Sequence, residues 1–221
     1  AGRVKDYMNW QIMDQMKEYE SDFDQMLFYL PLAGSSFKKI YYDDLMQRAV
    51  SKFVPADDLV VPYTATSLED CESVIHVIRM SENDLRKKQV GGFYSDVEVT
   101  PTHLIESELQ EKEKKLEGAT RGRDDRMFTI LECHVNVDLE GFEDVDPTNG
   151  EPTGIKLPYI VTLEEGTRKV LSVRRNYDVK DALKKRIDYF VHFKFLPGLG
   201  FYGFGLIHMI GGLSRTATAA L

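Results

Sequence analysis

Residues 187–205 read IDYFVHFKFLPGLGFYGFG and join two kinds of pattern in one short stretch. From Ile187 to Phe195 every second residue belongs to one apolar set, which predicts a two-faced β-strand. Four glycines follow within eight positions: Gly198, Gly200, Gly203 and Gly205. They predict a sharp turn that leads from the strand into a helix over residues 205–221, and we expect at least one of them to have a positive φ angle. The aromatic side chains between the glycines are expected to pack the turn against the strand: Phe201, Tyr202 and Phe204.

The first 33 residues carry the apolar stripe of a long amphipathic helix. Apolar side chains recur there at intervals of mostly three and four residues: Val4, Met8, Ile12, Met16, Tyr19, Phe23, Met26, Leu27 and Leu30. This spacing predicts one continuous rod of roughly 40 Å, since a helix rises ~1.5 Å per residue. Pro31 is expected to end the rod, because proline lacks a backbone N–H and restricts the residue before it.

Residues 34–196 are expected to form a β-rich body. Apolar and alternating runs predict strands over residues 37–42, 49–53, 59–63, 73–79 and 127–139, and a hairpin over 159–173 that turns at 164–167. A helix is predicted to begin with Ser81 as its cap and to end at Gly91-Gly92, and a charged helix is predicted over residues 102–116. The fold class is therefore α+β, in three parts: the helix 1–33, the body 34–196, and the turn with the start of a helix, 197–221. That last helix has no cap within the sequence, so we expect a fragment of a longer chain.

The charge balance argues against a dedicated nucleic-acid binder. The 221 residues include 28 Lys or Arg and 36 Asp or Glu, a net charge of −8, whereas nucleic-acid-binding domains are usually basic. Residues 166–221 have a net charge of +7 and residues 1–165 a net charge of −15. An acidic surface that meets a basic one, within the fold or between copies, is one interpretation, and two solvated faces are the other. No apolar run reaches 18 residues, and the charged start predicts no secretory signal.

No residue set predicts an active site, a cofactor or a metal site. The histidines lack metal-ligand spacing, and His134 and His192, each opposite the apolar set of its strand, are expected at the surface or hydrogen-bonded. Cys71 and Cys133 are expected to be reduced, buried thiols of an intracellular protein, with a disulfide between them left open. Residues 198–203 match G-x-G-x-x-G between a strand and a helix, so a nucleotide-binding enzyme fragment is the alternative. The bulky aromatic residues in this motif favour a packed turn instead.

Five basic residues near the C-terminal hairpin are candidates for contacts with DNA or with a neighbouring copy: Arg174, Arg175, Lys184, Lys185 and Arg186. Lysine and arginine side chains in such a run could contact phosphates or pair with an acidic surface. Solvated strand ends and loops are the simpler interpretation.

Three stretches resemble a known family. FLPGLGFYGFG (195–205), followed by LIHMIGGL (206–213), resembles the signature of portal proteins, the head-to-tail connectors of tailed bacteriophages, of the short-tailed podovirus type. ADDLVVPYTAT (56–66), continuing to Cys71, is similar to a second block of these proteins. LPYIVT (157–162) and VLSVRRN (170–176) resemble the hairpin that precedes the signature.

The resemblance implies a structural protein and not an enzyme. It implies a homo-oligomeric ring, typically a dodecamer, at one vertex of the capsid in the virion, assembled in the host cytoplasm. Genome DNA would pass through the ring during packaging and ejection, and a separate terminase, the capsid and tail adaptor proteins would bind to it. The chain would supply the peripheral wing and, after Gly205, the beginning of a stem helix. No cofactor and no membrane are implied.

Overall fold

The computed structural model describes residues 2–43, 46–99, 127–145 and 149–220. The chain contains helices and antiparallel sheets, with a helix at each end, which confirms the α+β class. The chain forms two compact units, one of residues 1–74 with 187–221 and the other of residues 75–186. The helix predicted over residues 102–116 lies outside the described residues.

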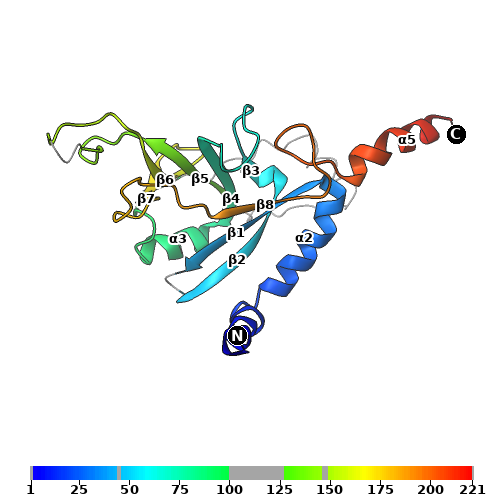
Figure 1. Ribbon diagram of the computed structural model, residues 1–221, viewed down its shortest axis with the longest axis horizontal. Coiled ribbons are helices and arrows are strands. Elements are labelled where there is room, and N and C mark those ends of the chain that lie inside the picture. Colours follow the sequence, from blue (N-terminus) through cyan, green and yellow to red (C-terminus); the bar gives the residue numbers. More distant parts are fainter. Residues whose placement is uncertain (1, 44–45, 100–126, 146–148, 221) are drawn as a thin grey trace. The chain divides into compact units, whose positions relative to one another are not determined.

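The N-terminal stripe forms two helices and not one continuous rod. Helix α1 (Gly2–Trp10) passes into a π-helical turn (Gln11–Gln15), and Met16, at φ −90° and ψ 75°, leaves the helical region. Helix α2 (Tyr19–Ala33) then begins and packs beside two strands, as Figure 1 shows. The prediction of a single rod is therefore wrong. Only α2 is attached to the sheet, where the Phe53 amide of β2 donates to the Asp22 carboxylate over 2.8 Å.

The predicted end of this helix at Pro31 is also wrong. Pro31 lies inside the last turn of α2, where a missing N–H removes a single hydrogen bond. The helix ends three residues later at Gly34, whose φ of 86° is the left-handed conformation that glycine adopts readily. The Gly34 amide donates to the Leu30 carbonyl over 2.8 Å and closes the helix.

The first unit contains a three-stranded antiparallel sheet in the order β2-β1-β8, built from β1 (Ser35–Asp43), β2 (Arg48–Pro55) and β8 (Phe190–Lys194). The strand predicted from Ile187 is shorter than expected and begins at Phe190. The strand predicted over residues 59–63 is also shorter: a 3-10 turn (Ala56–Asp58) leads into β3 (Leu59–Val60). The core of the unit is made of these buried side chains: Phe37, Val54, Leu59, Ala65, Cys71, Val74, Phe190 and Phe201.

The boundary between the two units lies within β4 (Ser73–Ser81). The second unit contains the rest of this strand and four further elements: α3 (Glu82–Val90), β5 (Met127–Val137), β6 (Leu157–Glu164) and β7 (Val170–Arg175). Strands β4 to β7 are hydrogen-bonded neighbours in chain order, and the predicted β6–β7 hairpin is confirmed. Ser81 caps α3 as predicted, since its hydroxyl accepts from the Asp84 amide over 3.2 Å. The core of this unit gathers under α3: Met80, Leu85, Tyr94, Phe128, Ile130 and Leu171.

The turn of the hairpin is held by a buried carboxylate that the sequence pattern does not reveal. Glu164 is fully buried and accepts from the Gly166 amide over 2.9 Å and from the amide and hydroxyl of Thr167 over 2.6 Å each. Three donors on one carboxylate compensate for its removal from water.

The final helix, α5 (Leu206–Ala220), confirms the prediction of a helix after the glycine-rich turn. None of its residues is buried, and within the first unit it begins near the C-terminal end of α2 (Figure 1). Among the helices of the described ranges, none is long and apolar enough to cross a membrane. Cys71 is buried and Cys133 is partly buried, and both are free thiols.

Candidate functional site: the glycine-rich junction

The turn over residues 195–205 lies against the end of α2 and the start of β1. The Gly203 amide donates to the Ser35 hydroxyl over 2.8 Å, and the Phe195 amide donates to the Gly34 carbonyl over 3.0 Å. The Phe204 amide donates to the Leu196 carbonyl over 2.8 Å and closes the turn on itself. Segments up to 168 residues apart in the sequence are therefore joined by one backbone–backbone hydrogen bond and one bond from a backbone amide to a side chain.

Three glycines of the turn, Gly198, Gly203 and Gly205, are required for close approach and not for a special backbone angle. A Cβ atom on Gly203 would lie 2.5 Å from the Gly34 oxygen and 2.6 Å from the Leu196 oxygen. A Cβ atom on Gly205 would lie 2.5 Å from the Gly34 nitrogen and closer still to the Leu32 oxygen. Real Cβ atoms essentially never approach backbone atoms within 3.0 Å, so no other residue fits at either position.

The prediction of a positive φ angle among the four glycines is wrong. The glycines of the described chain that have positive φ are Gly34, Gly92, Gly141, Gly150 and Gly154. The left-handed residue of the junction is Gly34, which the sequence reasoning missed. Its position directly after the last turn of α2 is the signal that could have identified it, because glycine is enriched there.

Gly198 and Gly200 differ in what surrounds them. A Cβ atom on Gly198 would clash with the Tyr202 carbonyl, whereas a Cβ atom on Gly200 would meet nothing within 4 Å. Three of the four predicted glycines are therefore constrained by contacts, and Gly200 lies in open space.

Of the three aromatic side chains of the turn, Phe201 packs against the final strand as expected, whereas Tyr202 and Phe204 contact other segments. Phe201 is buried and stacks on His192, with ring centres 4.8 Å apart, and His192 in turn stacks on Phe37 at 4.4 Å. The Tyr202 hydroxyl donates to the Leu59 carbonyl over 3.3 Å, and Phe204 lies edge-on to His208. The turn is thus packed on the core of the first unit through the His192 face of β8.

His192 is part of this packed stack and not a surface histidine. Its Nε2 lies 3.1 Å from the Ser35 hydroxyl, which also accepts from the Gly203 amide. Burial, with a smaller effect of the Lys194 ammonium, lowers the pKa of His192 to about 4. His134 is buried and paired with Glu132 over 2.8 Å, as expected for a hydrogen-bonded histidine.

The last amide of the G-x-G-x-x-G stretch and the two amides that follow it are hydrogen-bonded within the protein. A phosphate-binding loop presents its N–H groups to the ligand. Here the Gly203 and Phe204 amides are taken by Ser35 and Leu196, and the Gly205 amide donates to Nδ1 of His208 over 3.1 Å. Within the described ranges, no three histidine, cysteine, aspartate or glutamate side chains come together so that they could hold a metal ion.

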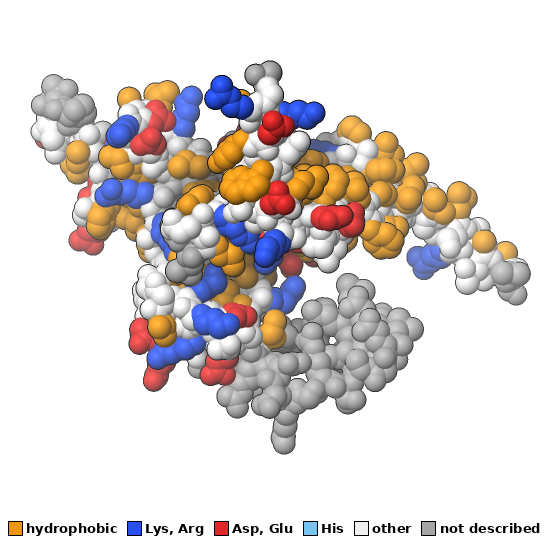
Figure 2. All heavy atoms as spheres, turned by 90° about the horizontal axis from the view of Figure 1, so that it is seen from below, with side chains coloured by type: hydrophobic (Ala, Val, Ile, Leu, Met, Phe, Trp, Pro, Cys, Tyr) orange, Lys and Arg blue, Asp and Glu red, His pale blue; other side chains and the backbone are white. Residues whose placement is uncertain are grey.

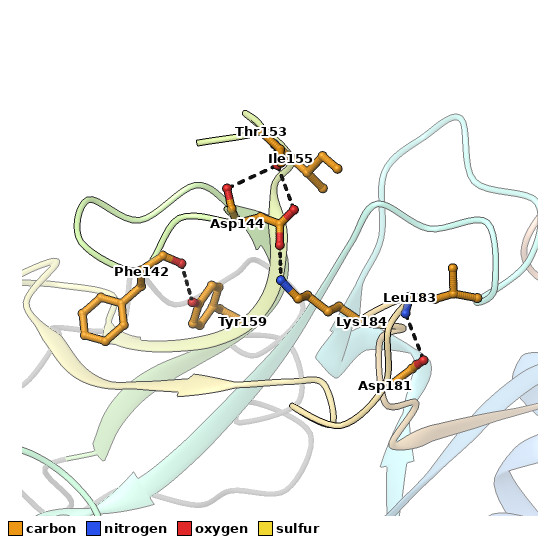
Figure 3. Close-up of polar contacts among 8 residues, drawn as sticks. All are labelled: Phe142, Asp144, Thr153, Ile155, Tyr159, Asp181, Leu183 and Lys184. Atoms are coloured by element: carbon orange, nitrogen blue, oxygen red, sulfur yellow. Dashed lines mark hydrogen bonds and ion pairs between the residues drawn. The ribbon is translucent and has the colours of Figure 1, made fainter. Parts of the chain in front are cut away.

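The five basic candidates lie in the second unit, where Arg174 and Lys184 make close polar contacts. The Arg174 guanidinium stacks on the Phe93 ring at 3.4 Å and donates to the Phe93 carbonyl over 3.1 Å. Lys184 forms an ion pair with Asp144, which also accepts from the Thr153 hydroxyl over 2.8 Å (Figure 3). These hydrogen bonds, with that from Lys184 as the largest cause, hold the pKa of Asp144 below its usual value.

The other three basic residues differ in exposure. Arg175 is exposed, and its guanidinium lies 6.0 Å from the centre of the Phe142 ring. Lys185 is exposed and Arg186 is partly buried. The side chains of Arg175 and Lys185 are therefore the most accessible of the five.

Neither a scan against models of protein families nor a search of curated proteins finds a match for this chain.

Proposed function

We propose that this chain is the wing portion, with the beginning of the stem, of a bacteriophage portal ring. The observation that carries the proposal is the location of the portal-like signature. In the sequence it spans residues 195–213, and in the fold these residues form the close-packed junction and the first half of α5. Such a junction fixes the direction in which α5 extends from the sheet of the first unit, and a ring subunit needs its stem in a fixed direction.

The exposed apolar side chains of α5 support this function. Ile207, Met209, Ile210 and Leu213 are exposed, Leu213 by 73%, and Figure 2 shows hydrophobic side chains gathered over this helix. The helix carries no charge before Arg215. An apolar helix face that the described chain leaves uncovered is typical of a protein–protein contact. In the proposed ring, α5 of one copy packs against α5 of its neighbours.

The charge distribution is compatible with a DNA channel. A subunit with a net charge of −8 lets a polyanion slide, whereas a basic lining would bind it. The acidic and basic parts of the chain allow side-by-side attraction in a ring that closes by rotation. The proposed partners are further copies of the chain, the passing genome, a terminase, the capsid and the tail adaptors, at one vertex of the virion.

A nucleotide-binding enzyme fragment remains the alternative function. It rests on the G-x-G-x-x-G match at 198–203 alone, and the hydrogen bonds that the Gly203, Phe204 and Gly205 amides make within the protein weigh against it. Melting of the chain in the presence and absence of ATP and NAD tests this alternative. No shift is expected, and a saturable rise in melting temperature would favour it over the portal proposal.

Electron microscopy of the full-length protein that we propose carries this chain tests the portal function. Negatively stained particles are expected to be closed rings with a central pore. Particles of a single copy, or open filaments, at micromolar concentration and about 0.15 M salt would overturn the proposal. The matched variants Gly203→Ala and Gly200→Ala report whether ring closure depends on the junction, since only the first crowds the backbone.

A further inference from the structure

An open groove of about 470 Å³ lies in the first unit beside the glycine-rich junction. This volume is within the range of ~300–1,000 Å³ that is usual for small-ligand sites. Its apolar walls come from the end of α2 and from the segment that leads into and follows β3: Ala33, Ala56, Leu59, Val60 and Val61. The polar groups at its edge are Ser35, Asp57, Tyr202 and His208.

Asp57 gives the groove a negative charge. Its side chain is exposed, and the ion pairs between described residues do not include it. The Asp57 carboxylate affects two nearby tyrosines. Burial is the largest cause that raises the pKa of Tyr29 and of Tyr202, and the charge of Asp57 is the second cause for both.

We propose that this groove binds an alkyl cation, that is, an ammonium or guanidinium group on a short hydrocarbon stem. Asp57 accepts hydrogen bonds from the charged head, and the Tyr202 ring offers its negative face to the same head. The methylene stem lies along the valine and alanine walls, as the stems of lysine and arginine do on apolar surfaces. An anionic ligand such as a nucleotide is disfavoured by the same carboxylate.

This chemistry has two sources, a free small molecule or a basic side chain of a second copy. Arg175 and Lys185 are exposed and are able to supply such a side chain. The proposal does not depend on the portal function, because it concerns a groove within one unit of the chain.

The test uses N-acetyl-arginine amide as the probe and the chain of 221 residues as the protein. The backbone amides of Asp57, Val60, Tyr202 and His208 are followed by NMR during the titration. Saturable shifts at these amides are expected, and Asp57→Asn is expected to weaken binding about tenfold or more. Glu69→Gln is the matched control, since it removes the same charge from an exposed residue that does not line the groove, and it should bind as the unmodified chain does.

Sedimentation at increasing protein concentration separates the two sources. Self-association that the probe and Asp57→Asn both suppress identifies a second copy as the occupant, and binding without self-association identifies a free ligand. Both results support the groove as a cation site. Equal binding to the unmodified chain and to a folded Asp57→Asn variant would overturn the proposal, as would shifts confined to other residues. Saturable ATP binding at the same amides would also overturn it.

Discussion

The amide of Gly203 donates a 2.8 Å hydrogen bond to the side-chain hydroxyl of Ser35, although 168 residues separate them in the sequence. The bond joins the start of the first strand to the turn that precedes the last helix. Next to it, the Gly34 carbonyl accepts from the Phe195 amide over 3.0 Å, and the Gly34 backbone occupies the space that a Cβ atom on Gly203 would fill. The direction of α5 is therefore coupled to the end of α2.

Gly203→Ala is expected to lower the free energy of unfolding by about 1–3 kcal/mol, because the added methyl group meets two backbone oxygens that cannot rotate away. Gly200→Ala adds the same methyl group in open space and should change stability by less than about 0.5 kcal/mol. Urea denaturation of both variants measures the difference. Equal stability of the two variants would contradict the close-approach role.

His192 makes the stability of the chain dependent on pH. Its pKa is about 4 in the folded chain, against about 6.5 in an unfolded one, so the unfolded state binds the proton more tightly. The stabilising effect of the neutral imidazole is complete above pH ~6.5 and is lost as the pH falls toward 4. His192→Phe, which keeps a ring between Phe37 and Phe201, should weaken this dependence, as urea titrations at pH 7.5 and 5.0 would show. An NMR titration that finds the His192 ring ionising near pH 6.5 would refute the prediction.

Ser81→Ala removes the side-chain cap of α3 and should cost about 1 kcal/mol of stability. The hydrogen bond from the Ser81 hydroxyl is also the largest cause that lowers the pKa of Asp84, so this pKa should rise in the variant. Ser81→Thr keeps a hydroxyl and serves as the control. Carboxyl NMR titration together with urea denaturation checks both effects: an unchanged Asp84 titration would exclude the hydroxyl–carboxylate bond, and unchanged stability would exclude the cap.

Lys184→Met is expected to raise the pKa of Asp144, because the hydrogen bond from Lys184 is the largest cause that lowers it. The stabilising effect of this pair is present above the usual aspartate pKa of about 3.9 and is lost as the pH falls below it. Lys185→Met removes the same charge from the adjacent, exposed residue and should leave Asp144 unchanged. Identical Asp144 titrations in the two variants would show that the pair in Figure 3 does not form in solution.

Local patterns predicted most of the regular elements. The alternation from Met127 predicted β5, the turn at 164–167 predicted the β6–β7 hairpin, and the Ser81 motif predicted the start of α3. These elements depend on residues close to one another in the sequence. The break near Met16 depends instead on distant partners, since the Glu18–Arg48 ion pair and the Asp22–Phe53 hydrogen bond hold only α2 to β2.

The candidate site was predicted only in part, because its contacts also join residues that are distant in the sequence. The clustering of glycines identified Gly203 and Gly205, but the Gly34 backbone determines their role. No local pattern reveals which distant segment approaches a glycine. The period-2 pattern placed His192 on the face opposite the apolar set, where a surface position was one expectation. That face is covered by Phe201 from the turn, which a strand pattern does not contain.

Cryo-electron microscopy of the full-length portal protein that we propose carries this chain tests the proposal most directly. We predict a closed ring around a central channel, with the helices of residues 206–220 from neighbouring copies side by side and with Ile210 and Leu213 between them. A map without a closed ring would contradict the account, and so would a ring in which these helices lie apart at its outer edge.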